Sequence, residues 1–220
     1  MRPLATSRTR VVTIAGVSRW ITLTLACLAV AATGSAAVAA ALAPTPSTLV
    51  LRRADVGQAY TGRGAPVDNA EAARGAPAGF ATKLARWGRI AGYQVDFARS
   101  AGPAALQDGP LEIQSSASVY RSEGGARLSF AYARRHLVPA GYAPLALAFA
   151  VGDEARQWVS QGQSGLGTVL HYVLIWRDRN VDAAIVVTGR VGVVSAADIA
   201  PLARRQQARI RAALRARHVP

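Results

Sequence analysis

The sequence has very little cysteine and few aromatic residues. Cys27 is the only cysteine and lies in an apolar run, so the rest of the chain has no thiol for a disulfide, a thiolate metal site or a cysteine nucleophile. Aromatic residues make up 6% of the chain, although 51% of its residues are hydrophobic. This balance predicts a core of small and branched side chains rather than large rings.

Signatures of metal or cofactor chemistry are lacking as well. The three histidines are His136, His171 and His218, and none has a second histidine or an acid at the spacing of metal ligands. We therefore predict no metal and no cofactor. A lone histidine between Val169 and Val173 is more typical of a hydrogen-bonded core residue than of a catalyst. The sequence favours a protein that is not an enzyme without deciding the point.

The N-terminal segment indicates export. Residues 1–19 carry four arginines and no acid, and an uncharged apolar run follows over residues 20–43. A basic flank, an apolar stretch and an A-x-A site at 37–39 are typical of a bacterial signal peptide. The alternative is an N-terminal membrane anchor formed by residues 20–43, which is long enough to span a bilayer. Both interpretations predict an extracytoplasmic protein of the cell envelope, either secreted after cleavage or membrane-anchored.

The chain is strongly basic, with 26 lysine and arginine residues against 12 acids and a net charge of +14. Lys83 is the only lysine, and so strong a preference for arginine is typical of a GC-rich genome as much as of a binding surface. Nucleic acid is not expected as a partner, because export would place the protein on the other side of the membrane.

After a short linker over residues 44–47, residues 48–220 are predicted to form a single α+β domain. Alternating polar and apolar side chains predict a hairpin, and two runs that are apolar on both faces predict a second hairpin at the middle of a sheet. The expected fold is an antiparallel sheet of about five strands with two long helices packed on one face. Strand segments are predicted at 89–99, 111–120, 145–151, 155–159, 168–176 and 181–188.

Two helices have clear start signals. Ser122 is placed to cap a helix that runs to about Leu137, whose apolar residues recur at helical spacing. Ser195 and Asp198 have the spacing of a capping box before the final helix, which we expect to bend or restart at Pro201.

Three short segments carry a resemblance. They are AVGDEAR at 150–156, VLIWRDRN at 173–180 and PLARRQQARI at 201–210. With the export signal, they make the chain similar to uncharacterised secreted or lipoprotein-like α+β domains common in actinobacteria. The resemblance implies an envelope or secreted location and a sheet with helices on one side. It implies no activity and no catalytic residues.

The adjacent acids Asp153 and Glu154 are one candidate site. A turn or bulge with Arg156 as the ion-pair partner of Glu154 is the favoured interpretation. The alternative is a secreted hydrolase that uses Asp153, Glu154 and His171.

A second candidate is a ligand pocket lined by aromatic residues. Its residues are Tyr93, Phe97, His171, Tyr172 and Trp176. The competing interpretation is that the aromatic rings form plain core. The pocket favours a non-catalytic extracytoplasmic domain that binds an envelope component, an apolar small ligand or a partner protein.

The third candidate is the arginine-rich C-terminal helix. Projection at 100° per residue places Arg204, Arg211 and Arg215 in one stripe opposite the apolar face. Such a stripe predicts contact with an anionic envelope lipid or polymer, or else an ordinary solvated face. The oligomeric state is not indicated by the sequence.

Overall fold

The computed structural model describes residues 43–100, 108–138, 141–165 and 167–216. The predicted signal peptide or anchor therefore lies outside the described residues, apart from Ala43. Within the described part, seven strands form one sheet in the order β1-β2-β3-β7-β6-β5-β4, and every neighbouring pair is antiparallel. The strands are β1 (Tyr60–Val67), β2 (Arg89–Arg99), β3 (Glu112–Tyr120), β4 (Ala143–Leu145), β5 (Glu154–Ser164), β6 (Gly167–Asp178) and β7 (Val181–Arg190). The predicted α+β class with an antiparallel sheet is confirmed, but the expected number of strands was too low.

The two predicted hairpins are present as β2–β3 and β6–β7. Strand β1 was missed because Gly62, Gly64 and Pro66 are unusual in a strand. The two glycines have a packing role, since a Cβ on Gly62 or Gly64 would collide with the rings of Phe97 and Tyr93. Rings on β2 thus lie across β1, where larger side chains would leave no room.

The region before β5 differs from the prediction. Of the strand expected at 145–151, only Leu145 pairs with β5, as the last residue of β4 (Ala143–Leu145). The chain then leaves the sheet edge, and Leu147 and Phe149 pack against the main core. An apolar run without strict alternation predicts burial better than it predicts the type of element.

The two long helices begin where their caps predict. The Ser122 side chain accepts a hydrogen bond from Gly125 N (3.1 Å) at the start of α5 (Glu123–His136). The capping box of Ser195 and Asp198 surrounds the 3₁₀ turn η3 (Ala196–Asp198), and α6 (Ile199–Arg215) follows with Pro201 in its first turn. Shorter helical segments are η1 (Pro46–Thr48), α2 (Arg53–Val56), α3 (Asn69–Ala72) and α4 (Phe80–Arg86).

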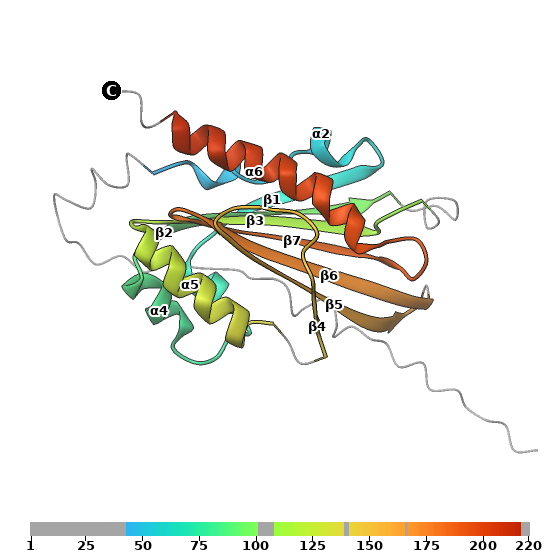
Figure 1. The fold of residues 1–220 in the computed structure, drawn as a ribbon, viewed down its shortest axis with the longest axis horizontal. Helices are drawn as coiled ribbons and strands as arrows, with labels where there is room; N and C mark the ends of the chain where they lie inside the picture. Colours follow the sequence, from blue (N-terminus) through green and yellow to red (C-terminus); the bar gives the residue numbers. More distant parts are fainter. Residues whose placement is uncertain (1–42, 101–107, 139–140, 166, 217–220) are drawn as a thin grey trace, which may run out of the picture.

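The long helices cover opposite faces of the sheet, which corrects the prediction that both pack on one face. Figure 1 shows α6 on one side of the sheet and α5 with α4 on the other. The alternation along β3 demonstrates this, because Ser115 hydrogen-bonds Gln206 of α6 whereas Tyr120 hydrogen-bonds Ser129 of α5. The apolar faces of the central strands require cover on both sides, so one helix layer is not sufficient.

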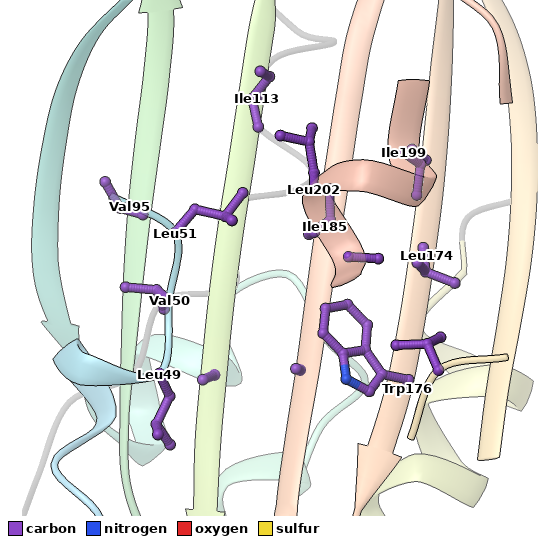
Figure 2. Packing of buried hydrophobic residues seen from close by; sticks show 14 of the residues in the cluster. Leu49, Val50, Leu51, Val95, Ile113, Leu174, Trp176, Ile185, Ile199 and Leu202 are labelled. Carbon is purple, nitrogen blue, oxygen red and sulfur yellow. The ribbon is translucent and has the colours of Figure 1, made fainter. Parts of the chain in front are cut away.

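The main core lies between α6 and the sheet (Figure 2). Leu49, Val50 and Leu51 lie beside α6 on the same sheet face and extend the cover over β3 and β2 (Figure 2). Burial of each large aliphatic side chain stabilises the fold by roughly 1.5–3 kcal/mol. A second cluster under α5 is formed by Val67, Ala72, Phe80 and Leu84. None of the helices in the described residues has the length and hydropathy needed to span a membrane.

Candidate functional site: a cleft between α5 and the sheet

A cavity of about 140 Å³ lies between α5 and the sheet face that α6 does not cover. Helices α4 and α5 supply apolar side chains to one wall. The opposite wall is formed by side chains of β3, β6 and β7, and Val186 and Ile175 are among the apolar ones. The helical wall contains Phe80, Leu84, Phe130, Ala133 and Leu137.

One part of this cleft is polar. Tyr120 Oη donates a hydrogen bond to Ser129 Oγ (2.6 Å), and both hydroxyls interact with the carboxyl group of Asp182. The Oδ1 atom of Asp182 is buried and has no hydrogen-bond partner among the described residues. An orphaned acceptor of this kind costs about 1–3 kcal/mol, which makes it the most unusual feature of the cavity.

Arg89 lies next to this polar group and is itself buried. Its guanidinium donates to Asn69 Oδ1 (3.1 Å), Val67 O (3.2 Å) and Ser118 Oγ (2.9 Å). The side chain crosses Gly92, where any Cβ would collide with Nη2. Arg89 is therefore held in place by three acceptors and by the missing side chain below it.

Burial shifts the ionisation of these groups. It raises the pKa of Asp182 to about 8, although the neighbouring hydroxyls and Arg89 oppose the shift. Burial lowers the pKa of Arg89 to about 10 and raises the pKa of Tyr120. At neutral pH Asp182 is thus mostly protonated and Arg89 remains charged, so the carboxyl group both donates and accepts hydrogen bonds.

The aromatic residues predicted to line a pocket lie mainly on the other face. Phe97, Tyr172 and Trp176 are buried in the core under α6, and Tyr93 packs against that core. Trp176 Nε1 donates to Gln207 Oε1 of α6 (2.7 Å). Of these rings, Trp176 also lines the cleft, whereas Tyr93, Phe97 and Tyr172 do not.

His171 lies on the same sheet face as the cleft but is not among its lining residues. Its Nδ1 is 3.0 Å from Thr188 Oγ1, and burial lowers its pKa. The Nε2 atom is buried and has no hydrogen-bond partner among the described residues. The surroundings favour a neutral imidazole held by one neighbour.

Asp153 and Glu154 form a structural ion-pair cluster. Arg177 Nη1 lies 2.9 Å from Asp153 Oδ2, and Nη2 lies 3.1 Å from Glu154 Oε1. Arg177 therefore takes the role predicted for Arg156, whose side chain donates instead to the carbonyl of Ala155.

The proposed hydrolase residues are not brought together. Glu154 is opposite Arg177 at one end of β6, whereas His171 is opposite Ser160 further along the same strand. At ~3.3 Å per residue the two positions are about 20 Å apart. That separation is too large for an acid and a base to act on one bond. In the described residues, no group of three His, Cys, Asp or Glu side chains has a geometry that could hold a metal.

The sequence interpretation missed the residues that define the cleft. The available signal was Asp182, a single acid in the otherwise apolar segment VDAAIVVT. An acid in a strand buried on both faces is expected to be paired or protonated. Arg89, Tyr120 and Ser129 carried no comparable signal, because only the fold brings them together.

No protein-family model matches the sequence, and no curated protein sequence matches it. Among solved structures, the extracellular domain of PknH from Mycobacterium tuberculosis superposes with a TM-score of 0.51 at 9% identity. The match covers 77% of this chain and 98% of that domain. The two chains share a fold. At this identity the likeness concerns the architecture alone, and it agrees with an α+β domain built on an antiparallel sheet.

Proposed function

We propose that this protein is a non-catalytic extracytoplasmic binding domain whose cleft holds a small apolar molecule with one polar end. The observation that carries the proposal is the unpaired Oδ1 of Asp182 in the polar part of a cavity whose helical wall is apolar. A ligand group that hydrogen-bonds this oxygen, either as donor to it or as acceptor from the carboxyl proton, would recover the cost of leaving it unpaired, and the apolar part of the ligand would gain from burial.

The size of the cleft limits the ligand. A cavity of about 140 Å³ holds roughly ten water-sized volumes at ~10–15 Å³ each. This space suits a small molecule or the end of a chain, with the remainder in solvent. The apolar helical wall, which includes Phe130 and Leu137, is suited to an alkyl or ring portion.

The charge state of the cleft favours an uncharged polar end. Because the pKa of Asp182 is raised to about 8, a cationic ligand would have to ionise the carboxyl group at neutral pH. The guanidinium of Arg89 already places a positive charge beside Asp182, and this charge would repel a cationic ligand. A hydroxyl or an amide is therefore the expected polar group.

Two features support the extracytoplasmic location. The basic and apolar residues 1–43 have the composition of an export signal or anchor, and the structural neighbour is itself described as an extracellular domain. An alkaline phosphatase fused after Ser47 tests the location, since that enzyme is active only after export. We expect an active fusion, and an inactive fusion produced in full amount would contradict the location.

Native mass spectrometry of the full chain purified from its host tests the binding proposal. We expect a bound small molecule on the wild type and its loss in Ala184→Leu, which fills the cleft from β7. The matched control is Ala98→Leu, an exposed strand position outside the cleft that is expected to keep the adduct. A clean apo mass for the wild type, or equal adducts in both variants, would contradict the proposal.

A further inference from the structure

A second hollow lies on the opposite side of the molecule, beside α6. Its volume is about 270 Å³, and the segment between β4 and β5 forms one side of it. The other side is a single flank of α6. The lining residues are Ala150, Val151, Arg204, Gln207, Ala208, Arg211 and Arg215. We propose that this hollow binds a phosphate group.

The arginines of α6 divide into two sets. On one flank, Arg209 is paired with Asp55 through three contacts of 2.8–3.1 Å, and Arg205 donates to the backbone carbonyl of the same residue. These two side chains fasten α6 to α2. The positive charge of Arg209 is thus neutralised within the fold.

The arginines on the flank that lines the hollow have fewer acidic partners to neutralise their charge. Within the described residues, neither Arg204 nor Arg215 has a carboxylate at ion-pair distance. Arg211 Nε is 3.5 Å from Asp178 Oδ2, an oxygen that also accepts a hydrogen bond from Gln207. Three guanidinium groups therefore share one carboxylate, which leaves an excess of positive charge around the hollow.

Two of the three arginines have a neighbour that restricts their side chains. The guanidinium of Arg204 lies 5.7 Å from the centre of the Phe149 ring, a cation–π contact. The Nε group of Arg211 faces Asp178. Its two Nη groups have no hydrogen-bond partner among the described residues, so they can bind a ligand. This arrangement reduces the entropy lost when those groups bind a ligand.

The spacing suits a tetrahedral oxyanion or a row of them. At a rise of ~1.5 Å per residue, Arg204 and Arg211 are about 10 Å apart along the helix axis, and Arg211 and Arg215 are about 6 Å apart. Guanidinium groups donate paired hydrogen bonds to phosphate oxygens. The phosphate could come from solution or from a lipid headgroup, because α6 forms the outer layer of one face (Figure 1).

The test measures binding of two phosphate probes to the full chain at constant ionic strength. Inorganic phosphate is titrated by calorimetry, and vesicles of phosphatidylglycerol are compared with vesicles of phosphatidylcholine by co-sedimentation. The variant Arg204→Gln/Arg211→Gln/Arg215→Gln removes the hollow's charges. The control Arg121→Gln/Arg127→Gln/Arg135→Gln removes the same charge from exposed positions at and near α5.

We expect the hollow variant to bind at least about tenfold more weakly and the control variant to change by less than about threefold. Saturable binding of inorganic phosphate would identify a free phosphate site, whereas binding of phosphatidylglycerol vesicles alone would identify a headgroup site. Equal loss in both variants would overturn the proposal in favour of net charge, and so would failure of both probes to bind. Should the triple variant not fold, Arg215→Gln alone is expected to weaken binding by about two- to threefold, and its matched control Arg135→Gln by less than about 1.5-fold.

Discussion

At the scale of single residues, Asp182 links the cleft to pH. The ordinary carboxyl pKa of 3.8 applies to the unfolded chain, and burial raises it to about 8 in the fold. Between these two values the folded protein keeps a proton that the unfolded chain has released. Stability arising from this group is therefore greatest at low pH and falls as pH rises toward 8.

Asp182→Asn tests this link, because an amide resembles the neutral carboxyl group but cannot ionise. We expect the free energy of unfolding of the variant, relative to wild type, to increase by about 1 kcal/mol or more from pH 5 to pH 8. Urea denaturation at both pH values measures the difference. The comparison with wild type cancels the pH dependence of other groups, and an equal difference at both pH values would refute the assigned shift.

Arg177 is a second residue whose burial gives it a structural role. Its side chain is 5% exposed, and it joins Asp153, Glu154 and the carbonyl of Arg179 at the β6–β7 turn. Arg177→Ala is expected to lower stability by about 2 kcal/mol, since buried hydrogen bonds to charged groups are lost. Arg74→Ala removes an ion pair whose arginine is 66% exposed, so it should cost at most about 0.5 kcal/mol. Similar melting curves for the two variants would contradict the structural role of Arg177.

At the scale of elements, α5 is positioned by one of two adjacent glycines. A Cβ on Gly125 would collide with the carbonyl oxygen of Trp87, whereas a Cβ on Gly124 has Ser122 Oγ at 3.9 Å as its nearest neighbour. The helix therefore approaches the end of α4 closely at Gly125 and leaves open space at Gly124.

Substitution by alanine at these two positions is expected to have opposite effects. Gly124→Ala should stabilise the protein by about 0.5–1 kcal/mol through helix propensity. Gly125→Ala should destabilise it by about 1–3 kcal/mol, because α5 must move away from Trp87. Thermal unfolding measures both changes. Equal effects would mean that α5 does not pack on Trp87 as described.

Local signals predicted the elements better than their arrangement. Ser122 and the Ser195–Asp198 box set the helix starts, and alternation set the hairpins β2–β3 and β6–β7. Strand β1 was not predicted, because its glycines make room for rings on another strand and that contact is visible only in the fold. Packing between distant segments leaves no periodic pattern in the sequence from which a strand could be predicted.

At the scale of the whole molecule, covering both sheet faces creates two different surfaces. Under α6 lies the main apolar core, in which Trp176 and Ile210 are fully buried. On the other face α5 meets polar side chains such as Ser116, Ser118 and Asp182, and a cavity remains. A prediction with both helices on one face contains no such cavity, and the walls of the cavity come from segments that are distant in the chain.

We propose above all that an apolar molecule with a hydroxyl or an amide binds in the cleft under α5. NMR of the isotope-labelled chain during titration with 1-hexanol tests it most directly. We predict saturable shifts of the Ser116, Ala133 and Ala184 amide signals, no shifts at Leu51 and Ile210 under α6, and no response in Ala184→Leu. Absence of saturable shifts, or shifts centred on the α6 face, would contradict the account.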